Sequence, residues 1–479
     1  MTRFPRLKVL TKPEVSTIYD KVLHFLEKKG VRVDHPQALK LLAKAGAQVD
    51  FRTNQVKFPK DIVEASLRSV PHKIRLAGRG KHQNGIVPHP KGLFYSWAST
   101  GCRYYVEPVT NIYRNVMLDD VANWGQLIEV LDNIDHASFL TPTDMPEQTA
   151  DIHSMKTMLE NTSKHMTVQP HSLQSVAYHI ELAQAVASVP LKKRPIMHIF
   201  SGSVAPFIFK PMDMEIILQS CRHEIPVEIQ SLTCMGATSP ITIAGSLILS
   251  YIELMAQLVM TQLFNPGNPV LCLASACATL DMLTGMSMNE GVKSEMVIPA
   301  GVQVAKEIFH TPVSSAGFLS DSYIPDGQAM MSAALKGLLA SQAGNDVLGV
   351  AGRLCSGKAI SNVQLILDDT VASILKRILG GIKVDEDTMA FQEIMDTKPG
   401  DDFLQLTHTL RHCRDAMRPD LFVGKPHETW IAEGSKDLTA RATDKYRELK
   451  KRMKPLDLST EVQNELNRIV KHADEHLIK

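Results

Sequence analysis

The chain has 479 residues, with 52 basic and 51 acidic side chains and a formal net charge of +1. This length is too great for one small domain and fits a large barrel with appendages, or two to three ordinary domains. A hydrophobic content of 44% with 22% charged residues excludes disorder as the bulk state. The balanced charge argues against a nucleic acid or an anionic membrane surface as the main partner.

The composition also bears on where the protein works. The N-terminus is not followed by an apolar signal core, and the most apolar stretch, 241–263, contains Glu253 and Gln257. A glutamate in mid-span is costly in lipid, so we expect a buried core helix and no membrane association. Seven scattered cysteines, an odd number, indicate reduced thiols and a cytoplasmic location.

The N-terminal quarter is predicted to fold as short helices and strands. Apolar residues at helical spacing predict helices over 13–30, 36–46 and 59–69, with a hairpin between the last two. Residues 72–117 are rich in glycine and aromatic side chains, and their alternation predicts strands. We therefore expect 1–117 to form an N-terminal helical and β-hairpin extension.

From residue 118 onward, short β-type runs alternate with helical stretches. The predicted strands are 136–142, 165–170, 195–201, 226–232, 269–275, 312–317 and 347–352. Seven strands separated by helices over about 240 residues indicate parallel βαβ units. An eighth strand could come from 72–117 or 380–405, which favours an α/β fold of the (β/α)8 TIM-barrel type.

This pattern divides the chain into three parts. We expect the catalytic barrel core over 118–360, and barrel completion with C-terminal helices over 361–479. The last part contains clear helices over 371–379, stopped by two glycines, and over 460–477, preceded by Ser459.

Most catalytic motifs are missing. There is no phosphate-binding loop, and Gly78-Arg79-Gly80 is followed by Gln83 where a dinucleotide fingerprint needs glycine. No G-x-S-x-G nucleophile motif is present, and Gly202-Ser203 lacks the pattern.

A zinc site is the serious alternative among these motifs. His408 and His412 are spaced to share one helix face, but Thr409 stands where a metalloprotease needs a glutamate. Cys272 and Cys277 are too far apart for a metal knuckle. A structural role for the two histidines is the better interpretation, and we predict no metal site.

Active sites of such barrels lie at the C-terminal ends of the strands. The residues at these ends are Thr141, Asp144, Gln169, His171, Phe200, Ser203, Phe207, Gln230, Thr233, Met235, Ser275, Ala276, Phe318, Asp321 and Arg353. They are neutral and aromatic as much as charged, with no strand-end lysine and no carboxylate cluster. Such a site suits chemistry that depends on positioning rather than on proton transfer.

Several local sequences together resemble the trimethylamine methyltransferase family. These are Gly30–Pro36 with Leu41–Ala47, Met235–Gly245, Glu253–Gln262 before Asn265-Pro266-Gly267, Asp281-Met282 with Thr284-Gly285, Asp321-Ser322 with Pro325-Asp326 and Gln328, and Phe403-Leu404 before His408-Thr409. They span about residues 20–440, so the resemblance covers nearly the whole chain.

The resemblance implies a (β/α)8 barrel that passes a methyl group to the cobalt of a separate corrinoid protein. Archaeal trimethylamine members use pyrrolysine, which would be expected in the loop around Asp321–Asp326. This chain has no nonstandard residue, and Tyr323 is the nearest equivalent candidate. This departure points to the members that demethylate quaternary amines of the glycine betaine, proline betaine or carnitine type.

The chemistry of that reaction suggests which residues bind the substrate. A quaternary nitrogen leaves as a neutral tertiary amine, so the protein mainly orients one N–CH3 bond and excludes water. Aromatic faces should hold the cation without binding it too tightly. The candidates for this cage are Phe200, Phe207, Tyr323, Tyr95 and Trp97, with Arg353 or His171 for a carboxylate and Gln230 for orientation.

Each candidate also has a purely structural interpretation, as core, loop packing or ion pair. The competing functions are a non-catalytic barrel that binds quaternary amines and a metal-dependent lyase or hydrolase on the same barrel. We expect no tightly bound cofactor, since the cobalamin is carried by the partner protein. We also expect the chain to form a homo-oligomer.

Overall fold

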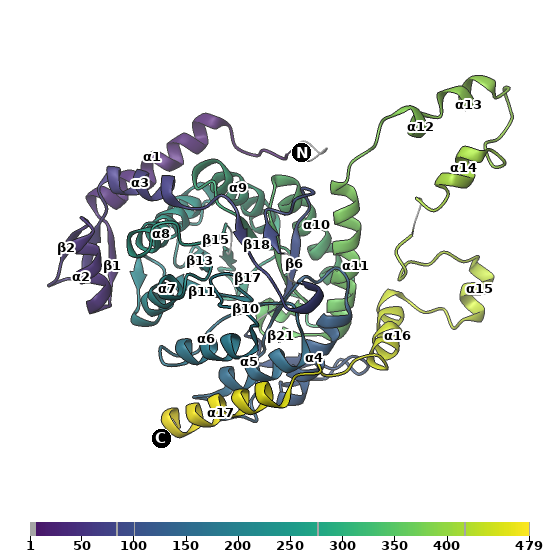
Figure 1. Ribbon diagram of the computed structural model, residues 1–479. Helices are drawn as coiled ribbons and strands as arrows, with labels where there is room; N and C mark the ends of the chain where they lie inside the picture. Colours follow the sequence, from purple (N-terminus) through teal and green to yellow (C-terminus); the bar gives the residue numbers. More distant parts are fainter. Residues whose placement is uncertain (1–5, 83–84, 100, 275–276, 416–417, 479) are drawn as a thin grey trace.

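A closed barrel of eight parallel strands forms the centre of the molecule (Figure 1). The computed structural model describes residues 6–82, 85–99, 101–274, 277–415 and 418–478. In order around the barrel the strands are β6 (Tyr95–Ala98), β9 (His136–Ser138), β10 (His165–Val168), β11 (Met197–Ser203), β13 (Val227–Ser231), β15 (Val270–Leu273), β18 (Val313–Ala316) and β19 (Val347–Ala351). Each strand pairs in parallel with both neighbours, and β19 closes the ring by pairing with β6.

The predicted (β/α)8 TIM barrel is therefore confirmed. All seven strands predicted from the sequence are present in the barrel. The eighth is β6, which comes from the aromatic-rich segment 72–117. The barrel thus begins at Tyr95, so the expected boundary at residue 118 lies too late in the chain, because β6 is held in the barrel by long-range pairing rather than by a local βα unit.

Eight helices surround the barrel, one after each strand. They are α4 (Leu118–Val130), α5 (Ala150–Asn161), α6 (Ser175–Val186), α7 (Pro211–His223), α8 (Ile243–Phe264), α9 (Val292–Ile308), α10 (Gly327–Ala343) and α11 (Asn362–Leu379). Helix α10 shows ordinary start and stop signals: Asp326 caps its first turn, and Gly344 ends it in the left-handed conformation.

Helix α8 is long and apolar enough to cross a membrane by length and composition. In the structure, 72% of its most apolar window is buried. It packs against α7, α9 and β13 of the barrel. It also supports the carboxylate of Glu253, which accepts hydrogen bonds from Ser203 and from the Phe207 amide. This is the behaviour of a core helix, as expected.

The N-terminal segment forms a small unit on the outer side of α8 (Figure 1). Its helices are α1 (Lys12–Lys28), α2 (Pro36–Lys44) and α3 (Lys60–Ser69), and its strands are β1 (Val31–Val33), β2 (Gln48–Asp50) and β3 (Gln55–Lys57). Strand β1 also pairs with β12 (Ile208–Phe209), which follows β11. The three predicted helices and the hairpin are all present, and their apolar faces join the main core.

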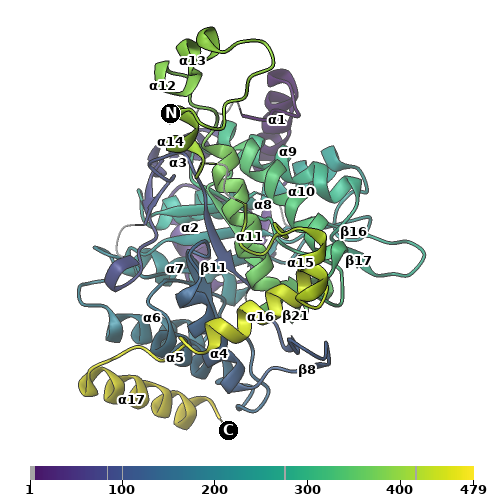
Figure 2. The same cartoon turned by 90° about the vertical axis from the view of Figure 1, so that its right-hand side faces the viewer.

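We call the end of the barrel at which the strands have their C-terminal ends the mouth. Two small sheets extend the barrel there. One contains β7 (Tyr104–Val106), β8 (Tyr113–Asn115), β20 (Arg353–Leu354) and β21 (Ala359–Ile360); the other contains β14 (Cys234–Met235), β16 (Ala278–Leu280) and β17 (Ser287–Met288). A hairpin of β4 (Ile74–Arg75) and β5 (Ile86–Val87) packs on the interior residues Leu271 and Val347. Figure 2 shows the β16–β17 hairpin projecting from the body.

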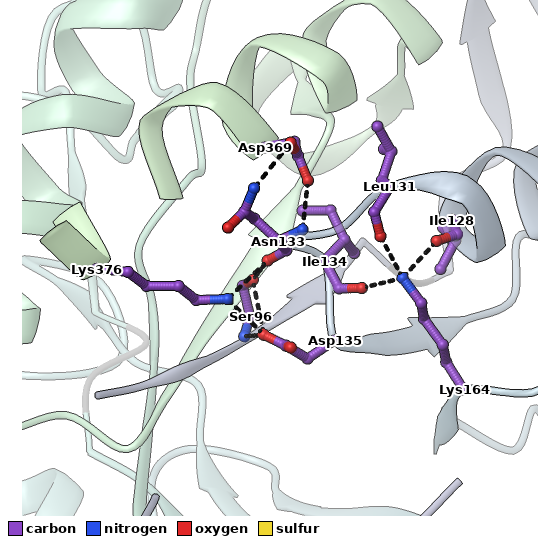
Figure 3. Close-up of polar contacts among 9 residues, drawn as sticks. All are labelled: Ser96, Ile128, Leu131, Asn133, Ile134, Asp135, Lys164, Asp369 and Lys376. Carbon is purple, nitrogen blue, oxygen red and sulfur yellow. Dashed lines mark hydrogen bonds and ion pairs between the residues drawn. The ribbon is translucent and has the colours of Figure 1, made fainter. Parts of the chain in front are cut away.

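The opposite end of the barrel is tied together by a buried polar cluster (Figure 3). The Lys164 ammonium is buried and donates to the carbonyl oxygens of Ile128, Leu131 and Ile134, at and just after the end of α4. Nearby, Lys376 on α11 donates to Asp135 at 2.9 Å. The cluster joins α4, α11 and the start of β10.

The C-terminal part contains an extended segment and two packed helices. Short helices α12 (Glu386–Met389), α13 (Phe391–Asp396), α14 (Thr407–His412) and α15 (His427–Ala432) stand away from the barrel (Figure 1). The chain then returns as α16 (Leu438–Lys450), which packs on α11, and ends with α17 (Thr460–Leu477) against α5 and α6.

Candidate functional site

A cavity of about 240 Å³ opens at the mouth of the barrel. Its lining comes from the strand ends, from α9 and α10, and from the turn after β20. The lining residues are Trp97, Gln169, Phe200, Gln230, Leu232, Leu273, Cys277, Asn289, Ser294, Val297, Ile298, Ala316, Leu319, Lys336, Val350, Arg353, Ser356 and Gly357. None of these described residues is an aspartate or a glutamate, so no carboxylate among them is available to bind a cation.

Two aromatic rings form part of the floor. The indole of Trp97 on β6 meets the Phe200 ring on β11 edge to face, with ring centres 5.6 Å apart. Space for the indole depends on Gly349 in the neighbouring strand β19, because a Cβ there would lie 2.0 Å from Trp97 Nε1. Both rings line the cavity, and the π-face of an aromatic ring attracts an ammonium ion.

Gly349→Ala is expected to destabilise the protein and displace Trp97. The added methyl group would overlap the indole, and overpacking of this kind costs about 1–3 kcal/mol. The midpoint of thermal unfolding and the tryptophan fluorescence should both change. Gly202→Ala is the matched control, since a Cβ on this β11 glycine would meet no described atom within 4 Å. Equal effects of the two substitutions would contradict the packing argument.

One wall of the cavity carries two basic side chains. Arg353 begins β20, and its Nε donates to the Gly357 carbonyl oxygen at 2.9 Å. Its guanidinium lies against Gly357, where a Cβ would be 3.1 Å from Nε and Nη2. Among the described residues, the guanidinium makes no other hydrogen bond, so its Nη groups are available for a planar anion such as a carboxylate.

The second basic group is Lys336 from the middle of α10. Its side chain is fully buried, and the ammonium donates to the Leu319 carbonyl oxygen at 2.7 Å. Burial lowers the pKa of Lys336, and the negative charges of Glu295, Glu290 and Asp321 partly offset that effect. With Arg353 it forms what we call the basic wall.

Lys336 was missed in the sequence because it comes from a helix and not from a strand end. The available signal was its position among small residues. It shares one face of α10 with Ala329, Ser332, Ala333 and Ala340, all of which are buried. A lysine on such a face must reach a polar partner or a cavity.

The loop after β18, which contains the position expected for pyrrolysine, is held by several polar contacts. Asp321 accepts hydrogen bonds from the amides of Asn289 and Glu290. Glu290 in turn accepts from Ser320 and from Gln328 on α10. The Tyr323 side chain points outward and is 70% exposed, so it does not line the cavity.

The structure therefore brings together four of the eight predicted substrate-binding residues. Trp97, Phe200, Gln230 and Arg353 line the cavity. The other four do not line it: Tyr95, His171, Phe207 and Tyr323. Of the further strand-end residues, Gln169 also lines the cavity, while Ser275 and Ala276 lie outside the described residues.

Three of those four residues have structural partners elsewhere. Tyr95, at the start of β6, stacks on His136 with ring centres 5.5 Å apart, at the end of the barrel opposite the mouth. Phe207 packs against Phe25 of α1, with ring centres 4.5 Å apart, since the chain after β11 turns outward to pair with β1. The backbone N–H of His171 donates to Asp151 at 2.8 Å, and its side chain is exposed.

Beneath the floor lies a buried chain of hydrogen bonds. Ser314 donates to one oxygen of Glu228, and the other oxygen is 2.8 Å from His198 Nε2. His198 Nδ1 is 2.9 Å from His165 Nε2, and His165 Nδ1 is 2.8 Å from the Ala77 carbonyl oxygen.

Counting protons along this chain gives its charge. A carbonyl oxygen can only accept, so His165 Nδ1 carries a proton. The His165–His198 and His198–Glu228 contacts need one proton each. The three side chains then hold three protons between them and are uncharged as a group. This group of three side chains therefore places no net negative charge under the aromatic floor.

The two histidines considered for zinc have other partners. His412 lies 2.8 Å from an Asp415 oxygen and 3.1 Å from an Asp387 oxygen, and these carboxylates raise its pKa. Its ring packs on His408, with centres 4.5 Å apart. Within the described part of the chain, no three His, Cys, Asp or Glu side chains are grouped to hold a metal ion.

Comparison with known proteins places methyltransferases among the relatives of this chain. A relative named trimethylamine methyltransferase MttB, from Desulfitobacterium hafniense, is 30% identical over 465 residues, covering 96% of this chain and 93% of the relative. A glycine betaine methyltransferase from another strain of that organism is 26% identical over 435 residues, covering 90% and 89%.

A solved structure shows the same fold. The monomethylamine methyltransferase MtmB of Methanosarcina barkeri superposes with a TM-score of 0.51 at 10% identity, over 97% of this chain and 98% of that protein. A family model described as trimethylamine methyltransferase (MTTB) matches residues 1–477. The chain therefore belongs to the trimethylamine methyltransferase family, and the prediction that it is an amine methyltransferase is confirmed.

Proposed function

We propose that this enzyme removes a methyl group from a zwitterionic quaternary amine, of the glycine betaine, proline betaine or carnitine type, and passes it to a separate corrinoid protein. The observation that carries the proposal is the lining of the mouth cavity: two aromatic rings, two basic side chains and no carboxylate among the described residues. A quaternary ammonium group has no N–H to donate, so it needs π-faces and no hydrogen-bond acceptor. Its carboxylate end fits the basic wall.

The cavity also suits the charge change of the reaction. The methyl carbon leaves nitrogen without the electron pair of the C–N bond, which stays on the amine as a lone pair. Positive charge is thus lost from the substrate nitrogen as the bond breaks. A carboxylate beside the nitrogen would stabilise the bound cation more than the transition state and slow the reaction. Aromatic rings above the uncharged His165–His198–Glu228 group avoid that penalty.

The methyl acceptor must come from outside the barrel. A cavity of about 240 Å³ is smaller than the range of about 300–1,000 Å³ that drug-sized ligands occupy, so a corrinoid ring cannot enter it. The corrinoid therefore stays on its own protein, which has to approach the mouth. What this chain supplies is the orientation of one N–CH3 bond toward the opening and the exclusion of water.

The relatives leave two substrate classes to compare, because one is named for trimethylamine and another for glycine betaine. A tertiary amine is bound most readily as a protonated ammonium, whose N–H would seek a carboxylate or carbonyl. The basic wall would repel such a cation, whereas it attracts the carboxylate of a betaine. The cavity therefore favours the betaine class.

The test is methyl transfer to a reduced corrinoid protein, followed by the absorbance change on methylation. Glycine betaine, proline betaine, carnitine, choline and trimethylamine are compared at equal concentrations. We expect activity with at least one betaine. Activity with trimethylamine alone, or only ligand-induced stabilisation without transfer, would contradict the proposal.

Trp97→Leu and Phe200→Leu should each lower kcat/KM for the preferred betaine about tenfold, since a desolvated cation–π contact contributes about 1–2 kcal/mol. Phe207→Leu is the matched control, because this ring packs on Phe25 instead of lining the cavity. It should leave kcat/KM unchanged. If all three variants behave alike, the aromatic floor does not hold the cation.

We also place the enzyme in a reducing compartment such as the cytoplasm. None of the seven cysteines forms a disulfide, and they are spread over the chain rather than paired. Burial raises the pKa of Cys221 to about 12, which keeps this thiol protonated and unreactive.

A further inference from the structure

The segment between α11 and α16, residues 380–437, leaves the body of the protein and returns to it, and we call it the arm. In Figures 1 and 2 its helices α12 and α13 stand clear of the barrel. None of the residues in α12–α15 is buried. The arm is joined to itself by pairs such as Arg411–Asp387, but it has no core of its own.

The arm exposes an unusual amount of apolar surface. Ile382, Val384, Phe391, Met395, Leu404 and Leu410 are each more than 60% exposed. Exposed apolar side chains gathered on one segment indicate an interaction site. On α13, Phe391, Ile394 and Met395 are spaced i, i+3 and i+4, so they share one helix face, and all three are exposed.

A groove of about 530 Å³ lies on the flank of the barrel, beside the root of the arm. It runs between α11, α16 and the end of α4. Its apolar walls include Ile366 and Ile374 of α11 and Leu449 of α16, and residues 418–422 at the end of the arm complete the lining. Its charged residues are four basic ones, Arg377, Arg418, Lys445 and Arg452, and three acidic ones, Asp132, Asp369 and Asp420, so the basic side chains are in excess. The groove therefore suits an amphipathic helix that carries negative charge beside its apolar face.

The charge of the arm is complementary to the rest of the chain. Residues 380–437 contain 12 acidic and 7 basic side chains, whereas the remaining residues contain 39 acidic and 45 basic ones. On α13 itself, Glu393 and Asp396 alternate with the apolar anchors. A second copy of this chain presents both the positive body and the groove that such an arm requires.

The position of α12 and α13 argues against the methyl acceptor as their partner. Helices of a (β/α)8 barrel run antiparallel to the strands, so α11 ends at Leu379 on the side opposite the mouth. The arm departs from that side. A corrinoid protein must approach the mouth to receive the methyl group, and an arm covered by another copy leaves the mouth open.

We propose that α13 of one copy docks in the flank groove of a second copy, with Phe391, Ile394 and Met395 as its anchors. The exchange is reciprocal in a two-fold dimer, because both copies carry an arm and a groove. The acidic residues of α13 then face the basic rim formed by Arg418, Lys445 and Arg452. This inference concerns assembly and does not rest on the substrate proposed above.

The first test is the mass of the protein in solution, measured by light scattering during size-exclusion chromatography. The wild type should be a dimer or a larger even assembly, and the variant Phe391→Ser/Ile394→Ser/Met395→Ser should fall to half the wild-type mass or less. Circular dichroism checks its fold, which should be unchanged because all three side chains are exposed.

The matched control is Met282→Ser/Leu283→Ser/Met286→Ser, which removes three exposed apolar residues from the β16–β17 hairpin at the mouth. It should retain the wild-type mass. A monomeric wild type, or an arm variant with the wild-type mass, would overturn the proposal. So would an arm variant of unchanged mass that transfers methyl groups poorly, since this would assign the arm to the methyl acceptor.

The second test locates the seat of α13 by cross-linking. In a Cys413→Ser background, which removes the exposed arm thiol, differently tagged copies with Ser373→Cys in the groove or Met395→Cys on α13 are mixed and oxidised. We expect a disulfide between the two introduced cysteines, which gives a product that carries both tags. Copies with Ser373→Cys and Leu283→Cys are the control and should not cross-link. A chain that carries both Ser373→Cys and Met395→Cys serves as a further check. If the disulfide forms only within such a chain and never between copies, the arm folds back on its own barrel and the exchange is refuted.

Discussion

Arg353→Met is expected to lower kcat/KM for the preferred betaine about 100-fold, mainly through a higher KM. The substitution keeps the length of the side chain but removes the guanidinium that faces the cavity. A hydrogen bond to a charged group contributes about 1.5–3 kcal/mol, and a bidentate pair with a carboxylate lies at the upper end of that range. Steady-state kinetics with the corrinoid acceptor at saturation measures the effect.

Two further measurements make this result specific. Choline has the quaternary nitrogen but no carboxylate, so Arg353→Met should not reduce kcat/KM for choline. The ratio of kcat/KM for the betaine to kcat/KM for choline should therefore fall. Arg103→Met is the control arginine, because Arg103 is exposed and lies 4.0 Å from Glu147. It should have no effect. An equal loss for betaine and choline would mean that Arg353 supports the fold of the mouth and does not recognise the carboxylate.

Lys164→Met is expected to lower the free energy of unfolding by about 3 kcal/mol, because it leaves three buried carbonyl oxygens without their donor. These oxygens belong to Ile128, Leu131 and Ile134, so the end of α4 and the start of β10 should loosen together (Figure 3). Denaturant unfolding followed by circular dichroism measures the change. Lys376→Met, in the same cluster but partly exposed and paired with Asp135, should cost only about 1 kcal/mol.

The effect of Lys164→Met should also depend on pH. Burial lowers the pKa of Lys164 from 10.5 to about 8. Between these two values the unfolded chain binds more protons at this residue than the folded chain, so its contribution to stability rises with pH. The difference in stability between wild type and Lys164→Met should therefore grow from pH 8 toward pH 10. A constant or shrinking difference in stability would show that burial does not lower the pKa of Lys164.

Local sequence patterns were sufficient for most of the barrel. The strands over 165–170 and 226–232 are short apolar runs between helices, and this pattern reflects parallel strands that are buried on both faces. Strand β6 was ambiguous because the alternation of Tyr95 and Trp97 also fits a hairpin. Its place in the barrel depends on pairing with β19, more than 240 residues away in the chain.

The candidate site shows the same division. Phe200, Gln230 and Arg353 were found because a strand end in a parallel barrel faces the mouth wherever it occurs. Phe207 and Tyr323 follow strand ends too, but one loop turns outward to meet α1 and the other exposes its ring. Whether a loop residue faces the cavity depends on contacts with distant segments, which local spacing does not encode.

The order of the strands and helices, the barrel class and the family were readable from the chain because each rests on local periodicity or on contiguous motifs. The near-neutral charge of +1 predicts that nucleic acid is not the main partner, and it conceals an uneven distribution of charge along the chain. The closing strand β6, the basic wall of Arg353 and Lys336, and the groove beside the root of the arm emerged only after folding. Each of these brings together residues far apart in the chain, and their proximity is set by barrel closure and side-chain packing rather than by sequence spacing.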